Sequence, residues 1–124
     1  MAQRASRGEL EAQVMDVLWD AEQWLTPREV QSAINRSRRG LAYTTVMTIL
    51  VRLWQKEMLD REPRGRAFAY RPVATRDEMA ALRMQEILDK SGDRLLALNH
   101  FVDGMSRREA SQLARVLDER TKRR

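Results

Sequence analysis

The chain of 124 residues contains no cysteine and a single histidine, His100. Without cysteine it forms no disulfide and has no thiolate nucleophile. A single histidine without cysteine is too few ligands for a Cys/His zinc site, and it leaves no second histidine for a catalytic triad. We therefore expect no metal site, no cofactor and no enzymatic activity.

Long apolar segments are also missing. The longest apolar runs, such as Leu95–Leu98, contain four residues, whereas a membrane-spanning helix needs about twenty. The first residues, Met1 to Arg4, lack the apolar region of a secretory signal. We expect no membrane insertion and a cytoplasmic location.

Positive charge is concentrated in the middle of the chain. Residues 36–72 carry nine basic and three acidic side chains, whereas residues 1–35 carry three and six, and residues 73–124 eleven and nine. A net charge of +5 favours an anionic partner, and this distribution indicates one electropositive face.

Four S/T-x-x-E sequences mark helix starts, because their two polar side chains can satisfy free backbone N–H groups reciprocally. These pairs are Ser6 with Glu9, Thr26 with Glu29, Thr75 with Glu78 and Ser106 with Glu109. They predict helices over residues 7–20, 26–35, 75–90 and 106–120, and apolar periodicity adds a helix over 93–103.

A further helix, without such a start signal, is predicted by the spacing of Val46, Ile49, Leu50 and Leu53 on one face. The other face carries Thr44, Thr45, Thr48, Arg52 and Gln55. Threonine is a mediocre helix former, so several threonines on an exposed face indicate a ligand surface. The methionines, Met47 and Met58 among them, are predicted to fill gaps in the core.

Two short strand-like segments, 58–63 and 67–72, flank Arg64-Gly65-Arg66 and predict a hairpin with a basic tip. Three helices followed by a hairpin is the order of a winged helix-turn-helix, whose third helix enters the major groove of DNA. The predicted fold is mainly α, with a winged-helix DNA-binding domain over 1–72 and a three-helix dimerisation domain over 73–124.

This fold assigns DNA-binding roles to one face of the first domain. Side chains in the first turns of the third helix reach base edges, and arginines before the helix and on the hairpin contact phosphates. The predicted base contacts are Tyr43, Thr44, Thr45 and Thr48, and the predicted phosphate contacts are Arg28, Arg38, Arg39, Arg52, Arg64 and Arg66.

Residues 73–124 contain more large apolar side chains than three short helices can bury alone, which predicts an intertwined homodimer. The predicted dimerisation residues are Met84, Ile87, Leu88, Leu95, Leu98, Phe101, Val102, Leu113 and Leu117.

Two segments resemble the penicillinase repressor and methicillin-resistance regulator family. They are Leu41–Leu53, LAYTTVMTILVRL, and Arg64–Tyr70, RGRAFAY, with Lys56 and Leu59 between them. Residues 93–117 look like the dimerisation helices of that family, so the resemblance covers nearly the whole chain. It implies a dimeric transcriptional repressor that binds a palindromic operator in double-stranded DNA and controls β-lactam-response genes.

The resemblance also implies release by proteolysis. In the family a membrane-bound sensor protease responds to the antibiotic, and the repressor is cut in its dimerisation region, between Asn and Phe in the best-known members. Here the matching residues are Asn99, His100 and Phe101, so one residue separates the pair. Glu57 replaces the usual Gly after the recognition helix, and either this helix end needs no left-handed residue or Glu57 is strained.

Copper-responsive relatives carry a cysteine-rich C-terminal motif, and the lack of cysteine argues against copper sensing. Two other functions remain open. One is a winged-helix module whose basic face binds an acidic protein, and the other is a repressor released by a small effector.

Overall fold

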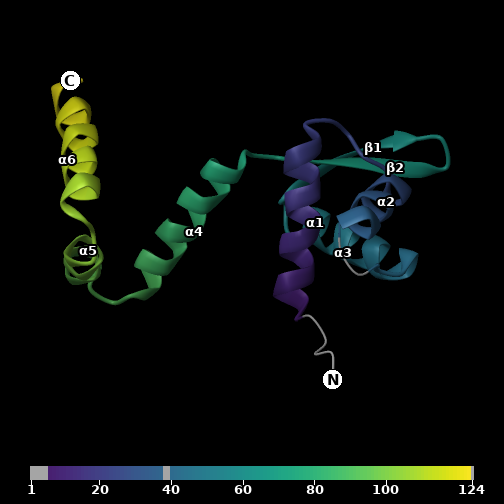
Figure 1. The fold of residues 1–124 in the computed structure, drawn as a ribbon, viewed down its shortest axis with the longest axis horizontal. Coiled ribbons are helices and arrows are strands. Elements are labelled where there is room, and N and C mark those ends of the chain that lie inside the picture. The colour runs from purple at the N-terminus through teal and green to yellow at the C-terminus, as the bar shows by residue number, and fades with distance from the viewer. Residues whose placement is uncertain (1–5, 38–39, 124) are drawn as a thin grey trace. The chain divides into compact units, whose positions relative to one another are not determined.

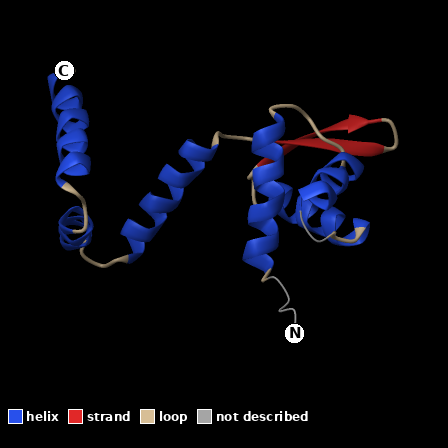
Figure 2. Ribbon diagram, in the orientation of Figure 1, coloured by secondary structure: helices blue, strands red, loops and turns tan. Residues whose placement is uncertain are grey.

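The computed structural model describes residues 6–37 and 40–123 (Figure 1). Its elements are α1 (Arg7–Ala21), α2 (Pro27–Ser37), α3 (Tyr43–Gln55), β1 (Leu59–Arg64), β2 (Ala67–Pro72), α4 (Arg76–Lys90), α5 (Arg94–Asp103) and α6 (Arg107–Lys122). Figure 2 shows the two strands as an antiparallel hairpin beside α1–α3. This order confirms the predicted mainly α fold with a winged helix-turn-helix.

Chain contacts divide the molecule into two compact units, Met1–Met79 and Ala80–Arg124. The first unit contains α1–α3, the hairpin and the first turn of α4, and the second contains the rest of α4 with α5 and α6. The domain bounds 1–72 and 73–124 stay a prediction.

The helix start signals form as the sequence predicts. Glu29 Oε1 accepts the Thr26 N–H at 2.9 Å, while Thr26 Oγ1 accepts the Glu29 N–H at 3.3 Å. Thr75 with Glu78 and Ser106 with Glu109 form the same reciprocal pair, and Ser6 Oγ accepts the Glu9 N–H at 3.1 Å. The backbone N–H of Thr26 lowers the pKa of Glu29, since it stabilises the carboxylate.

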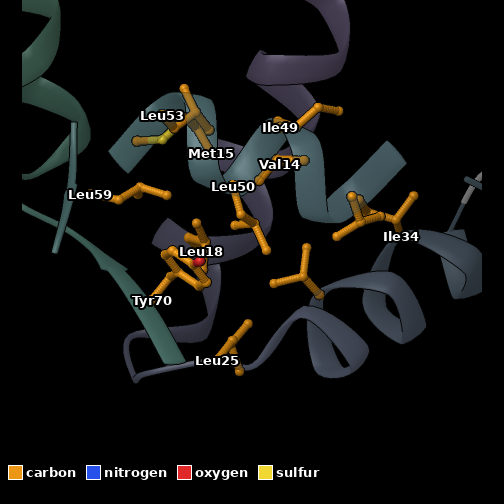
Figure 3. Packing of buried hydrophobic residues seen from close by; sticks show 12 residues of the cluster. Val14, Met15, Leu18, Leu25, Ile34, Ile49, Leu50, Leu53, Leu59 and Tyr70 are labelled. Atoms are coloured by element: carbon orange, nitrogen blue, oxygen red, sulfur yellow. The ribbon is translucent and has the colours of Figure 1, made fainter. Parts of the chain in front are cut away.

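The core of the first unit lies between α1, α2, α3 and the hairpin (Figure 3). It consists of side chains that are almost fully buried: Val14, Met15, Leu18, Leu25, Val30, Ile34, Val46, Ile49, Leu50, Leu53, Leu59 and Tyr70. Leu25, between α1 and α2, pairs with Tyr70 of β2 through two backbone hydrogen bonds of 3.0 and 2.7 Å. The loop before α2 is thereby held against the hairpin.

Met58 packs against this core as predicted, but Met47 is not among the described residues that do so. The reason is its position on α3. Helical geometry turns residue 47 away from the buried strip of Val46, Ile49 and Leu53.

The backbone at the end of α3 distinguishes the two alternatives for Glu57, namely that no left-handed residue is needed there or that Glu57 is strained. Glu57 adopts a left-handed conformation with φ 65°. Its N–H donates to Trp54 O and the Met58 N–H donates to Leu53 O, both at 3.0 Å. This is a Schellman motif, which usually has glycine at the left-handed position, so Glu57 carries strain of about 1–2 kcal/mol.

The hairpin pairs Leu59 with Pro72 through to Arg64 with Ala67, so the first strand begins and ends one residue later than predicted. Gly65 and Arg66 form the two-residue loop, and Gly65 has φ 62°. A positive φ at the first loop position fits a type II′ turn, for which glycine is preferred.

Helices α4, α5 and α6 contain no buried residue. Ile87 is 69% exposed and Leu95 is 71% exposed. The first turn of α5 is capped by Asp93, whose side chain accepts the Leu96 N–H at 3.0 Å. The large apolar side chains of the second unit are therefore at most half-buried within that unit.

Candidate nucleic-acid interface

One strip of α3 points directly away from the core. Residues 44, 48, 51 and 55 recur at helical spacing, half a turn from the buried strip of Val46, Ile49, Leu50 and Leu53. Thr44, Thr48 and Gln55 are exposed. The strip is therefore available to a ligand over three turns of helix.

Thr48 already uses its hydroxyl hydrogen within the helix. Its Oγ1 donates to Thr44 O at 2.9 Å. A hydroxyl has one donor and two acceptor lone pairs, so Thr48 can still accept a hydrogen bond and present its methyl group.

A groove runs along one side of this strip, between α3 and the first turn of α1. It has a volume of about 340 Å³ and is lined by Arg7, Leu10, Thr44, Thr45, Thr48, Ile49 and Arg52. The structure thus brings together four of the predicted DNA contacts, Thr44, Thr45, Thr48 and Arg52. Arg7 joins them and was missed, because no local pattern shows that α1 begins beside α3.

The other side of the site lies where α2 and α3 begin. The guanidinium carbon of Arg28 is 5.1 Å from the centre of the Tyr43 ring, a cation–π contact. Tyr43 is half-buried. This contact brings together two more predicted residues and fixes the first turn of α3 against α2.

The turn before α3 is ordered by two side chains of α2. Asn35 Oδ1 accepts the Leu41 N–H, and Gln31 Nε2 donates to Leu41 O, both at 3.1 Å. Arg38 and Arg39, predicted to contact phosphates, lie outside the described residues.

On the hairpin, Arg64 and Arg66 are exposed, as expected for phosphate contacts. Arg64 also contacts Glu62 at 3.4 Å and donates to Trp24 O at 3.5 Å, so part of its charge is compensated. The structure does not bring these two arginines into the groove beside α3.

Two further arginines of the hairpin stack on tryptophans. Arg61 lies 3.5 Å from the Trp54 ring centre and 4.0 Å from that of Phe68, and Arg71 lies 4.4 Å from Trp24. Arg61 and Arg71 belong to neighbouring cross-strand pairs, so these contacts attach the end of the hairpin away from its loop both to α3 and to the loop before α2. Sequence alone shows the residue types but not the pairing.

The far end of α3 is fixed to α1 by an ion pair. Lys56 Nζ lies 2.9 and 3.0 Å from the two carboxylate oxygens of Glu11, which is almost buried. Together with the Schellman motif, this pair holds the helix in a defined orientation.

The predicted dimerisation residues lie on α4, α5 and α6. Seven of them are exposed: Met84, Ile87, Leu95, Leu98, Phe101, Val102 and Leu117. Leu88 and Leu113 are half-buried. The structure of one chain leaves their role in dimerisation as a prediction.

The predicted cleavage residues Asn99, His100 and Phe101 all lie within α5. Asn99 Nδ2 donates to Leu95 O at 3.0 Å, one turn earlier in the helix. The backbone at this site is therefore helical.

Over residues 6–37 and 40–123, no group of three or more His, Cys, Asp or Glu side chains could hold a metal ion. In the same part of the chain, no helix is both long and apolar enough to cross a membrane.

Comparison with known proteins gives a consistent result. Residues 7–119 match the family described as Penicillinase repressor. The chain is 43% identical over 122 residues to the transcriptional regulator BlaI of Mycobacterium tuberculosis, in strains CDC 1551 / Oshkosh and ATCC 25618 / H37Rv, and the match covers 96% of this chain and 88% of that protein.

Among solved structures, the monomeric form of Bacillus licheniformis BlaI in complex with the blaP half-operator is similar, with a TM-score of 0.46 and 26% identity over 62% of this chain and 88% of that one. A CopR repressor structure has a TM-score of 0.42 and 32% identity over 60% of this chain and 97% of that one.

Proposed function

Since the chain belongs to the penicillinase repressor family, we propose that it is a transcriptional repressor that binds operator DNA through α3 and the hairpin. The observation that carries this proposal is the exposed strip of α3, with Thr44 and Thr48 on the side opposite the core. A helix presented in this way fits the major groove.

Two kinds of DNA contact follow from the geometry. Tyr43, Thr44, Thr45 and Thr48 lie in the first two turns of α3, where side chains reach base edges. Arg52 flanks the strip, Arg28 lies at the start of α2, and Arg64 and Arg66 lie on the hairpin, positions suited to phosphates. Arg38 and Arg39 complete the proposed set, and Arg7 is added to it.

We propose that two copies bind together. The uncovered apolar side chains of α4–α6, such as Ile87, Leu95 and Phe101, support a homodimer in which each copy covers the other. Residues 1–72 then bind DNA and residues 73–124 dimerise. Two linked winged helices require a palindromic operator whose half-sites lie about 34–36 Å apart, or a multiple of that.

Release by proteolysis is proposed from the family resemblance, with the genes of the β-lactam response as targets and a membrane-bound sensor protease as the enzyme. The candidate bond lies near Asn99, His100 and Phe101 inside α5. A protease needs an extended substrate, so cleavage requires local unwinding of α5. In a single chain no buried residue of α5 opposes that unwinding, whereas in the proposed dimer the partner would also cover Leu95 and Phe101, so unwinding would loosen the dimer as well.

The test is a selection of genomic DNA fragments by the purified full chain at near-physiological salt. Recovery of one short palindrome upstream of a few genes is the expected result. Recovery of fragments in proportion to their length would contradict the proposal and favour the alternative, in which the basic face binds an acidic protein.

A further inference from the structure

The exposed strip of α3 is polar except at one place. Val51 lies at one edge of the strip, seven residues after Thr44, and Met47 lies one turn before it on the adjoining side. Both side chains are half-buried although they lie outside the core cluster. Valine lowers helix stability relative to alanine, so neither packing nor helix propensity explains Val51 at this position.

Val51 and Met47 border a shallow hollow on the helix surface. The hollow has a volume of about 330 Å³ and is lined by Met47, Thr48, Val51, Arg52 and Gln55, all of which belong to α3. Its floor is apolar, and Arg52 and Gln55 provide a polar rim. The Thr48 hydroxyl hydrogen is engaged by Thr44 O, so Thr48 adds a methyl group and an acceptor but no free donor.

The major groove offers one apolar group for such a surface. Each base pair presents donors and acceptors there, but only thymine adds a methyl group, at C5. We propose that this hollow receives the thymine C5-methyl group of an operator base pair, and that Val51, supported by Met47, is a specificity-determining residue. This inference rests on the proposed function, which places α3 in the major groove.

The proposal explains why a repressor whose strip carries two exposed threonines also keeps an apolar side chain there. Loss of one methyl group from an apolar contact weakens binding about fourfold. The hollow therefore discriminates thymine from any base that lacks this group, including uracil, which has the same hydrogen-bonding edge as thymine.

The experiment compares duplexes that differ only in this methyl group. The palindrome selected by the full chain is synthesised with thymine, and again with deoxyuridine replacing one thymine in each half-site, position by position. Affinities are measured for the wild-type chain, for Val51→Ala and for Val73→Ala. Val73 is an exposed valine outside α3 and provides the matched control.

The wild type and Val73→Ala should bind about fourfold more weakly per half-site when uracil replaces the contacted thymine. Val51→Ala should bind both duplexes equally. Alanine favours helix, so the variant should fold, and Val51→Ser, which also removes both γ-methyl groups, is a second test with the same expected loss of discrimination.

The outcomes separate this inference from the proposed function. Failure of the wild type to select any sequence contradicts the proposed function and removes the basis of the inference. Selection of a site at which no uracil replacement weakens binding overturns only the inference. The same holds if Val51→Ala and Val51→Ser keep the full wild-type preference for thymine.

Discussion

Leu50 and Leu95 are the same residue type in opposite surroundings. Leu50 of α3 is fully buried among α1, α2 and the hairpin, whereas Leu95 of α5 is 71% exposed. The difference extends to the whole of each unit, because every buried hydrophobic residue in the described part of the chain lies before residue 80 and helices α4–α6 contain none.

This contrast shows where each part obtains its stability. The first unit buries a core of its own, which fixes α3 and thereby the exposed strip. The second unit has apolar faces that gain stability only when another surface removes them from water. On our proposal, a single chain can contact one half-site, whereas binding two half-sites at once requires a dimer.

The largest expected effect comes from placing a charge on an apolar face of the second unit, because this should prevent a second copy from covering that face. Leu95→Glu should weaken dimerisation by about 3–6 kcal/mol, because two-fold symmetry removes two leucines that each contribute about 1.5–3 kcal/mol when buried. Sedimentation equilibrium measures the effect. Gln112→Glu adds the same charge at a polar position of α6 and should leave the dimer intact; equal behaviour of the two variants would contradict the proposed interface.

A cavity in the core of the first unit tests whether this unit obtains its stability from its own buried side chains. Leu50→Ala should lower the free energy of unfolding by about 2–5 kcal/mol, since Leu50 is fully buried and its removal leaves a cavity. Urea unfolding measures this value. Leu82→Ala removes a leucine that is 56% exposed and should cost about 0.5 kcal/mol or less. A similar loss for both variants would show that α4 is covered to the same degree as α3.

Thr45 and Arg52 both line the groove beside α3. Substituting each in turn distinguishes sequence recognition from electrostatic attraction to DNA. Thr45→Ala should reduce discrimination between operator and random DNA by about 1–3 kcal/mol, while Arg52→Ala should weaken binding to both alike and reduce the salt dependence by about one ion per site. Competition binding at several salt concentrations measures both. Equal loss on all sequences for Thr45→Ala would remove its base-reading role.

The smallest effect concerns a helix start in the second unit. The Ser106 N–H lowers the pKa of Glu109, so the folded state favours the carboxylate. This stabilisation is present above the ordinary glutamate pKa of about 4.3, and it is lost as pH falls through the lower folded value. Glu109→Gln keeps an acceptor without titrating. The wild type should therefore gain Tm relative to the variant as pH rises from about 3 to 5, and a constant difference would exclude this origin.

The sequence predicts those features that depend on neighbours along the chain. Reciprocal pairs such as Thr26 with Glu29 mark where helices begin, and the spacing of Val46, Ile49, Leu50 and Leu53 distinguishes the buried face of α3 from the exposed one. Both rest on the fixed periodicity of the helix.

Features that depend on packing between distant segments were not predictable. Arg7 reaches the groove only because α1 begins beside α3, and Arg61 stacks on Trp54 only because β1 packs against α3. The sequence left two alternatives for Glu57, and only the backbone bonds after α3 distinguish them. Met47 was assigned to the core from residue type alone, and its helical position excludes that role.

The central claim is that two copies form a dimer through α4–α6, and that the two winged helices of this dimer bind the two half-sites of one palindrome. Sedimentation equilibrium of the full chain with a duplex carrying the selected palindrome tests it most directly. We predict two chains per duplex for the wild type, and for Leu95→Glu a stepwise binding of single chains at higher concentration. One wild-type chain per palindrome, with the affinity unchanged by Leu95→Glu, would contradict the claim.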